Sequence, residues 1–332
     1  MKAWTITQPG KPDVLELRET QPPEMGPTDV RIAVQAIGLN RADILQRQGL
    51  YPAPPGTNPD VPGLEYAGVV TEVGSNVQGR QPGDRVMGLV GGGAYAEQVV
   101  VNERETIAVP ASLSITDAAA VPEAFLTAYR AIFLEGGLQP GGWCLIRAAT
   151  SGIGIAAMQL TRAFGARSLG TSRSMERLNA VRHWGLDAAH AEQDGPLVDA
   201  VRQHTGPGAH VILDLVGGSG YLEENMACLR PEGTQVVVGI MAGRDDSIDM
   251  GTLLFKRLTL RAMTMRSLPL ERRIGLAQLF TERLAPFFAE GRLKPVVDTV
   301  RPFDQAREAH ELMESGVHTG KIVLANLDNA GG

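Results

Sequence analysis

Short runs of alternating hydrophobic and polar residues dominate the first third of the chain. Residues 30–34, 68–73 and 94–101 are such runs, and turn-forming clusters around Gly74 and Gly83 interrupt the pattern. Alternation bounded by Gly, Pro and Asn is typical of strands in an antiparallel sheet. The pattern therefore predicts a small, mostly β domain over about residues 1–117.

From about Ala118 onward, strand-like apolar runs alternate with helical periodicity. Asp117 can cap the first helix, Pro122 can kink or restart it, and Gly136 ends the helical pattern. We expect strands at residues 143–147, 167–172, 210–216 and 235–239, and helices at 154–164, 175–184 and 222–229. Strands that alternate with helices of about ten residues predict a parallel sheet covered on both faces.

The C-terminal stretch carries two further helical patterns, at residues 270–291 and 303–316, and a closing strand at 321–325. Because this stretch follows a complete α/β unit, we expect it to rejoin the first domain. A chain of 332 residues has room for about two domains. The fold class that follows is α/β, with a doubly wound parallel sheet and a second, mostly β domain.

Composition narrows the class of protein. A content of 43% hydrophobic and 20% charged residues excludes intrinsic disorder. The 31 basic and 37 acidic residues give a net charge of −6 without any Lys/Arg-rich run, so we expect no nucleic-acid partner. No window approaches about 18 uninterrupted apolar residues, so we expect no membrane span. The two cysteines, Cys144 and Cys228, cannot form a disulfide scaffold, which favours a reducing, cytoplasmic location.

A glycine-containing loop lies between the strand expected at 143–147 and the helix after it. Ser151, Gly152, Ile153 and Gly154 stand where a dinucleotide fold needs a tight turn, and glycine lets the backbone approach a pyrophosphate closely. The helix N-terminus adds free N–H groups and the positive end of its dipole. The match to G-x-G-x-x-G is imperfect, and the alternative is a plain strand-to-helix turn. A second strand about twenty residues later favours the dinucleotide site.

The end of that second strand indicates which cofactor is used. It carries Ser172, Arg173, Ser174 and Arg177, with no acidic residue at the strand tip. An NAD site needs Asp or Glu there to accept a hydrogen bond from the ribose 2′-hydroxyl. Hydroxyls and guanidinium groups instead suit a 2′-phosphate, so we predict NADPH. The alternative is that both arginines are solvated residues at the start of a helix.

The distribution of histidine and cysteine argues against a metal site. His183 is the first of the six histidines, so the N-terminal domain has no imidazole. A zinc alcohol dehydrogenase polarises its carbonyl with a metal held by Cys, His and an acid. We therefore predict no metal site, and we expect Cys144 and Cys228 to be core residues and all six histidines to be structural or on the surface.

Several motifs then point to a known family. They include Asn40-Arg41-Ala42-Asp43, Pro62-Gly63-Leu64-Glu65-Tyr66-Ala67-Gly68, Pro122-Glu123-Ala124-Phe125-Leu126-Thr127-Ala128-Tyr129 and Gly320-Lys321-Ile322-Val323-Leu324. Together with the phosphate loop, they resemble the zinc-independent quinone oxidoreductases (zeta-crystallin-like) of the medium-chain dehydrogenase/reductase superfamily. In zinc-using relatives a cysteine falls about where Asn40 stands, and a histidine about where Leu64 stands.

The resemblance implies a GroES-like catalytic domain at residues 1–122 and 265–332 and a Rossmann NADPH-binding domain at 123–264. It implies a substrate side formed by Asn40, Asp43 and Tyr51. It also implies a set of cofactor-binding residues: Asn40, Thr127, Ser151, Gly152, Ile153, Gly154, Ser172, Arg173, Ser174, Arg177, Val216, Gly217, Gly239, Ile240, Met241, Thr264 and Met265. Two departures concern the adenosine side, where Arg147 replaces a common histidine and a common tyrosine is missing near His190.

Other interpretations of the substrate-side residues stay open. Tyr51 could donate a proton, gate the site or anchor a surface loop. Asn40 could hold a carbonyl or the ribose, or form a turn. Asp43 is equally suited to catalysis and to capping a helix. We interpret Glu65 as a buried structural acid paired with an arginine.

The resulting hypothesis is a metal-free NADPH:quinone oxidoreductase. A quinone is already electrophilic, so placement of the nicotinamide would supply most of the rate. The alternatives are an NADPH-dependent reductase of α,β-unsaturated carbonyls or enoyl thioesters, and a non-catalytic NADPH-binding regulator. We also expect a homodimer, because residues 235–240 could leave an exposed edge on the parallel sheet, unless helices cover that edge.

Overall fold

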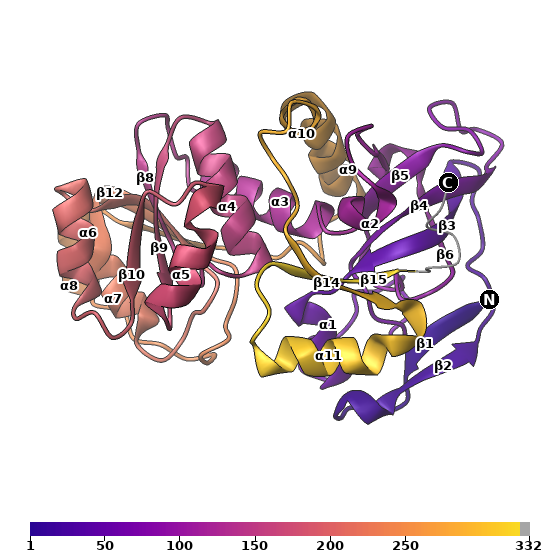
Figure 1. Ribbon diagram of the computed structural model, residues 1–332, viewed down its shortest axis with the longest axis horizontal. Coiled ribbons are helices and arrows are strands. Elements are labelled where there is room, and N and C mark those ends of the chain that lie inside the picture. Colours follow the sequence, from indigo (N-terminus) through magenta and orange to yellow (C-terminus); the bar gives the residue numbers. More distant parts are fainter. Residues whose placement is uncertain (326–332) are drawn as a thin grey trace. The chain divides into compact units, whose positions relative to one another are not determined.

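The computed structural model describes residues 1–325 of the chain (Figure 1). It divides into two compact units, one formed by Met1–Glu123 together with the chain from Met265 onward, the other by Ala124–Thr264. Within residues 1–325, no helix has both the length and the apolar character needed to cross a bilayer. The α/β fold class expected from the hydrophobic pattern is confirmed.

The first unit is built on a seven-stranded, mainly antiparallel sheet. Its strand order is β14-β15-β3-β4-β5-β7, and β6 also pairs with β3, while β1 and β2 form a separate antiparallel pair. The strands are β1 (Lys2–Ile6), β2 (Leu15–Glu19), β3 (Asp29–Gly38), β4 (Glu65–Val73), β5 (Arg85–Leu89), β6 (Gln98–Asn102), β7 (Ile107–Ala108), β14 (Val297–Pro302) and β15 (Lys321–Ala325). The helices that begin in this unit are α1 (Arg41–Arg47), α2 (Ile115–Ala118), α3 (Pro122–Tyr129), α9 (Leu270–Leu279), α10 (Ala285–Ala289) and α11 (Ala306–Ser315).

The C-terminal strand completes this sheet. β15 pairs antiparallel with β3, with Val323 opposite Gly38 and Leu324 opposite Ile37. Val30, Ile32 and Val34, which alternate along β3, point into a core that also holds Trp4 and Tyr66. Burial of one face of an antiparallel sheet is what the alternation in the sequence indicates.

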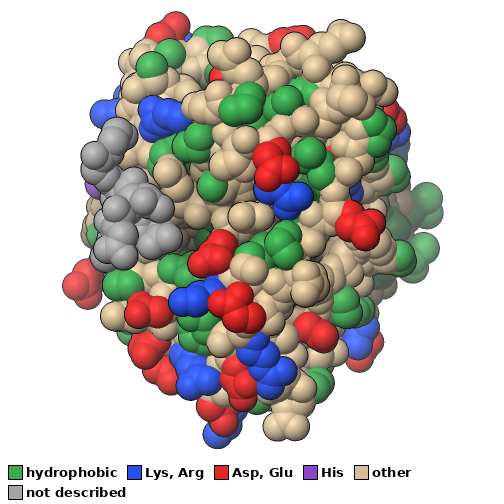
Figure 2. Space-filling view, turned by 90° about the vertical axis from the view of Figure 1, so that its right-hand side faces the viewer, with side chains coloured by type: hydrophobic (Ala, Val, Ile, Leu, Met, Phe, Trp, Pro, Cys, Tyr) green, Lys and Arg blue, Asp and Glu red, His purple; other side chains and the backbone are tan. Residues whose placement is uncertain are grey.

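On the face shown in Figure 2, acidic and basic side chains are intermixed.

The second unit is a six-stranded, entirely parallel sheet. The strands are β8 (Trp143–Ile146), β9 (Arg167–Ser172), β10 (Ala188–Ala191), β11 (Ala209–Asp214), β12 (Leu229–Val237) and β13 (Thr259–Ala262), in the spatial order β10-β9-β8-β11-β12-β13. The helices are α4 (Gly152–Ala163), α5 (Met175–Val181), α6 (Leu197–Thr205), α7 (Tyr221–Cys228) and α8 (Met250–Lys256). Figure 1 shows α4 and α5 on one face of the sheet and α6, α7 and α8 on the other. Numbered within the sheet, the order is 3-2-1-4-5-6, the dinucleotide-binding order whose direction reverses beside β8.

The central strands of this sheet are apolar because both of their faces are covered. Cys144, Leu145 and Ile146 of β8 are fully buried, as is Ile212 of β11. Cys228, at the end of α7, is buried as well, which confirms that both cysteines are core residues. Burial raises the pKa of each thiol to about 12, so neither is a nucleophile at neutral pH.

Three expectations about individual elements are wrong. Residues 235–240 do not form the edge of the parallel sheet, because β13 pairs with β12 and takes the edge position. The strand expected over residues 94–101 begins only at Gln98, since Tyr95 and Ala96 instead bond to and bridge the strand β1. The helix expected over 270–291 is interrupted by a π-helical turn at Phe280–Leu284 and continues as α10.

Candidate functional site

The loop after β8 leads directly into the N-terminus of α4. Ser151 is the N-cap residue, since its Oγ accepts a hydrogen bond from the Gly154 amide at 3.1 Å and donates one to the Ala148 carbonyl at 2.8 Å. Among residues 1–325, the first-turn amides of Gly152 and Ile153 make no hydrogen bond. These N–H groups, at the positive end of a twelve-residue helix, can bind an anion.

Close packing of this loop requires a glycine at position 154. A Cβ atom there would lie 2.6 Å from the carbonyl oxygens of both Ala148 and Ala149. Ala148 itself has a positive φ of 54°, which shows how tightly the chain turns between strand and helix. The segment therefore makes the tight strand-to-helix turn that a phosphate loop needs, and its binding of a phosphate stays a prediction.

The loops after β11 and β12 meet at the same edge of the sheet. The buried carboxylate of Asp214 accepts hydrogen bonds from the amides of Val216 (3.0 Å) and Gly217 (2.9 Å), and its other oxygen accepts from Asn225 and Gln235. A Cβ at Gly217 would lie 2.4 Å from the Gly239 carbonyl oxygen, so the two loops are in contact. Sequence reasoning missed Asp214, although a single acid that ends an apolar strand was a signal.

The side chains expected around an adenosine 2′-phosphate follow β9. Ser172 is buried at the strand end, and Ser174 is the N-cap of α5, where its Oγ accepts from the Arg177 amide at 3.3 Å. Arg173 is exposed, and Arg177 is half-buried in the first turn. β8 and β9 are neighbouring parallel strands, so these residues lie at the same end of the sheet as the phosphate loop.

The remaining expected cofactor residues come from other segments. Ile240 and Met241 follow β12 and are exposed, at 51% and 58%. Thr127 is buried within α3. Thr264 ends the second unit, where its carbonyl accepts a hydrogen bond from Arg130 at 3.0 Å, and Met265 belongs to the first unit.

Asn40, which we expect on the substrate side, lies in the first unit, and nearly every hydrogen-bonding position of its carboxamide is occupied. Its Nδ2 donates to Glu65 Oε1 at 2.9 Å and to the Gly38 carbonyl at 3.2 Å, and its Oδ1 accepts from Lys321 Nζ at 2.7 Å. An amide has two N–H donors and two oxygen lone pairs. Asn40 therefore has one acceptor position left and no remaining donor.

A buried ion pair holds Asn40 in this arrangement. Lys321 Nζ lies 2.6 Å from Glu65 Oε1 and also donates to the Leu39 carbonyl. The second oxygen of Glu65 accepts from the amide of Glu123 at 2.8 Å. Glu65 is buried as expected, but its partner is a lysine and not an arginine. Lys321 was missed, although a lysine within an apolar terminal strand was a visible signal.

Asp43, the third residue of α1, forms a capping box with the N-cap residue Asn40 and is completely buried. Its Oδ2 accepts from the Asn40 amide at 2.9 Å and from the Tyr95 hydroxyl at 3.3 Å. A side chain with no exposed surface does not contact a substrate directly, so the geometry favours the capping interpretation. Asp43 acts on the site through Asn40.

A directional hydrogen-bond chain continues from Asp43 toward α11. His310 Nε2 lies 3.1 Å from the Tyr95 hydroxyl, and its Nδ1 lies 3.3 Å from a guanidinium nitrogen of Arg47. Because arginine only donates, Nδ1 must accept, so Nε2 carries the proton and donates to Tyr95. Burial, with a smaller effect of Arg47, lowers the pKa of His310 to about 3, so the ring is neutral. His310 is structural, as expected.

Tyr51 is held by an arginine that the sequence did not reveal. Arg266 is buried, lies 5.1 Å from the centre of the Tyr51 ring and donates to the Tyr51 carbonyl at 2.8 Å. The same guanidinium bonds Gly91 and Gln46. Tyr51 is half-buried in this packing, and no sequence pattern indicated the contact.

The residues around Asn40 do not suit a zinc ion. Leu64 is apolar and buried, and the Lys321 ammonium already bonds both Asn40 and Glu65, so a divalent cation would meet a fixed positive charge. In residues 1–325, no group of three His, Cys, Asp or Glu side chains is arranged to hold a metal ion.

Segments of the chain match two families of known proteins. Residues 26–111 match the alcohol dehydrogenase GroES-like domain family, and residues 186–324 match a family described as zinc-binding dehydrogenase. A quinone oxidoreductase-like protein 2 homolog from Nematostella vectensis is 34% identical over 97% of this chain and 88% of its own.

Two solved structures have similar folds over 98% of this chain. An Escherichia coli quinone oxidoreductase complexed with NADPH has a TM-score of 0.87, 27% identity and 100% of its chain covered. An NAD-dependent alcohol dehydrogenase has a TM-score of 0.87, 31% identity and 99% of its chain covered.

The parallel sheet, its phosphate loop and the GroES-like unit define an oxidoreductase of the medium-chain dehydrogenase/reductase superfamily. Within it, the chain belongs to the quinone oxidoreductase branch.

The burial of Asp43 predicts a pH-dependent stability. Desolvation raises the pKa of this carboxyl to about 7, although the Asn40 amide, Lys321 and Arg266 oppose the shift. Between about pH 4 and 7 the folded protein holds a proton that the unfolded chain releases, so rising pH lowers the free energy of unfolding by up to about 1.4 kcal/mol per pH unit. Asp43→Asn should remove this contribution, and urea unfolding from about pH 5 to 8 measures it.

The expected signature is that the free energy of unfolding of D43N minus that of the parent increases with pH up to about 7 and then levels off. His310 contributes equally to both proteins and cancels in the difference. Asp13→Asn, which neutralises an exposed carboxyl, is the matched control. A difference independent of pH would show that Asp43 is ionised throughout.

Proposed function

We propose that this protein transfers reducing equivalents from NADPH to small electrophilic acceptors of the quinone type, without a metal ion. The observation that carries the proposal is the engagement of Asn40 by Lys321, Glu65 and Gly38. On the substrate side that the family resemblance assigns to it, Asn40 can accept a hydrogen bond but has no donor left to polarise a carbonyl. Such a site suits an acceptor that is already electrophilic.

The residues at the carboxyl ends of the parallel strands fit a dinucleotide. The first-turn amides of α4 would bind the pyrophosphate, and Arg173 and Arg177 would bind the 2′-phosphate, for which a guanidinium provides a planar pair of donors. Thr127, Val216, Gly217, Gly239, Ile240, Met241, Thr264 and Met265 would border the ribose and nicotinamide.

The chain's own groups would then orient the reactants. When bound, the nicotinamide supplies a hydride. The open lone pair of Asn40 would accept a hydrogen bond from a ribose hydroxyl, which favours the ribose over a carbonyl as its ligand. The loop of Tyr51, held by Arg266, would position the acceptor, and protons for the reduced oxygens would come from water.

Turnover with a panel of acceptors tests the function. We expect loss of absorbance at 340 nm with NADPH and ortho- or para-quinones, and slower loss with α,β-unsaturated ketones. Faster reduction of the enones would favour the alkene-reductase alternative. Binding of NADPH without turnover of any acceptor would favour a regulator. Activity that falls on chelation and returns with zinc would contradict the metal-free proposal.

Cofactor preference depends on the two arginines after β9. Replacing Arg173 and Arg177 with Ala should raise the KM for NADPH by about tenfold or more, because charge-assisted hydrogen bonds to the 2′-phosphate are lost. The KM for NADH should change little. Steady-state kinetics measure the KM for each cofactor. Equal increases in the KM for NADPH and for NADH would refute the assignment of these arginines to the 2′-phosphate.

Gly154→Ala is the matched contrast. Its Cβ would displace the loop carbonyls of Ala148 and Ala149, which would disturb the pyrophosphate site common to both cofactors. G154A should therefore weaken NADPH and NADH alike. A selective loss of NADPH in this variant would show that the phosphate loop is not the shared anchor.

A homodimer formed through β13 is part of the proposal. β13 is the edge of the parallel sheet, and the helix before it exposes Met250, Leu254 and Phe255, the last at 81%. A two-fold axis could pair β13 with its copy and cover these apolar side chains.

Leu254→Asp combined with Phe255→Asp should convert a dimer into a monomer, because two carboxylates would be buried in the interface. Sedimentation velocity measures the mass. Val317→Asp, at an exposed apolar residue of the other unit, should leave the dimer intact. A parent protein that sediments as a monomer would contradict the proposal.

A further inference from the structure

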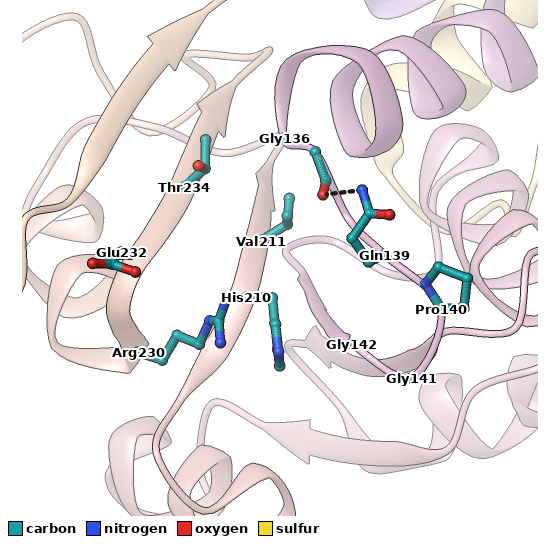
Figure 3. A pocket seen from close by; sticks show the side chains of 11 residues that line it. Gly136, Gln139, Pro140, Gly141, Gly142, His210, Val211, Arg230, Glu232 and Thr234 are labelled. Atoms are coloured by element: carbon teal, nitrogen blue, oxygen red, sulfur yellow. Dashed lines mark hydrogen bonds between the residues drawn. The ribbon is translucent and has the colours of Figure 1, made fainter.

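The second unit contains a recess at the end of its sheet opposite the phosphate loop. It has a volume of about 460 Å³ and lies where β8, β11 and β12 begin, against the loop of residues 136–142 (Figure 3). Pockets for small metabolites start at about 300 Å³. Gly137 and Gly141 line it, and a Cβ at either would meet no atom within 4 Å, which shows open space above the loop.

An irregularity in strand pairing builds this recess. Ala209 of β11 pairs with Leu229 of β12, but Val211 pairs with Thr234, so residues 230–233 form a bulge opposite the single residue His210. Glu232 within the bulge has a φ of +64°, a strained conformation for a non-glycine residue. In Figure 3 the guanidinium end of Arg230, from β12, lies toward the ring of His210, from the neighbouring strand β11.

Arg230 has no ion-pair partner within residues 1–325. Its Nε is buried and has no hydrogen-bond acceptor among residues 1–325, and the guanidinium makes no ion pair with a carboxylate of that part of the chain. A buried donor left without an acceptor is destabilising, and groups of this kind call for an explanation. A bound anion would supply the missing acceptor.

His210 adds a second donor with a defined tautomer. Its Nδ1 accepts a hydrogen bond from the Trp143 amide at 3.1 Å, so the proton resides on Nε2. Burial, with a smaller effect of Arg230, lowers the pKa of this imidazole, so it is neutral at pH 7. Among the described residues that line the recess, Glu232 alone carries a carboxylate, and it is paired with Arg257 at 3.2 Å.

We propose that this recess is a binding site for a small organic oxyanion, a carboxylate or a phosphate, held by Arg230 and the Nε2–H of His210. The guanidinium fork matches the two oxygens of either group. The glycine loop and Val211 leave room for the organic part of the ligand.

The site is separate from the one proposed for the dinucleotide. The phosphate loop follows the carboxyl end of β8, whereas Trp143, whose amide bonds His210, begins that strand. The strands are parallel, so the two sites lie at opposite ends of the sheet. The inference therefore does not depend on the cofactor or on catalysis.

Calorimetric titration of the full-length protein with methyl phosphate and with benzoate, at constant ionic strength, tests the proposal. We expect saturable binding of at least one of them, and its identity distinguishes a phosphate ligand from a carboxylate ligand. Arg230→Gln should weaken that binding by about tenfold or more, because a charge-assisted pair is lost. Glu232→Gln should strengthen it, because a repelling charge is removed.

Arg173→Gln combined with Arg177→Gln is the matched control, since these arginines belong to the other end of the sheet. The double variant should bind the oxyanion as the parent does. Choline chloride, a small organic cation, should not bind. R230Q could fail to fold, which circular dichroism would detect. In that case the affinity of E232Q for the oxyanion, compared with that of the parent, still tests whether removing a negative charge strengthens binding.

Four results would overturn the proposal. They are no saturable binding of either oxyanion, unchanged affinity in R230Q, weaker binding in E232Q, and loss of binding only in the R173Q/R177Q variant. The last result would place the anion at the nucleotide site. It would support the proposed cofactor preference while removing the recess as a binding site, so the two proposals fail separately.

Discussion

The arrangement of the first unit depends on one buried ion pair, Lys321 with Glu65, at 2.6 Å. Removing both charges from water is costly, and the cost is offset only because each charge has several further partners. Lys321 also bonds Leu39 and Asn40, and Glu65 also bonds Asn40 and the Glu123 amide. The pair thereby joins the last strand, the central sheet and the segment entering α3 around one side chain, Asn40. What Asn40 can offer a ligand is decided by these contacts.

The second unit uses backbone groups where the first uses charges. Among residues 1–325, the loop before α4 presents backbone amides without a hydrogen bond and has no Cβ at Gly154. The neighbouring loops are held by the buried carboxylate of Asp214. The two ends of the same sheet then differ in chemistry. The carboxyl ends of the strands carry helix N-termini and hydroxyls, and the amino ends carry the bulge that exposes Arg230 to the recess.

Much of the fold was predictable because burial imposes periodicity. β3, β8, β9, β11, α4 and α11 have strong alternating, apolar or helical patterns, and the structure has them within a few residues of the expected bounds. β10 and β13 were missed because they are short and lie at sheet edges, where fewer apolar residues are needed. The glycine loop was visible because Gly152 and Gly154 lie two residues apart, between a predicted strand and a predicted helix. Arg266, in contrast, is brought to Tyr51 across more than two hundred residues and leaves no local pattern.

By itself the sequence determined the α/β class, the glycine loop between strand and helix, the basic and hydroxyl residues after β9, and the motifs of the quinone oxidoreductase branch. These are local properties, since spacing along the chain is sufficient to encode a strand, a cap or a turn. Only the tertiary structure decided that Glu65 pairs with Lys321, that Asp43 is buried as a cap, that β13 is the sheet edge, and that Arg230 and His210 share a recess. Those facts depend on which distant segments pack together and which charges lose their water, and neither is a function of sequence spacing.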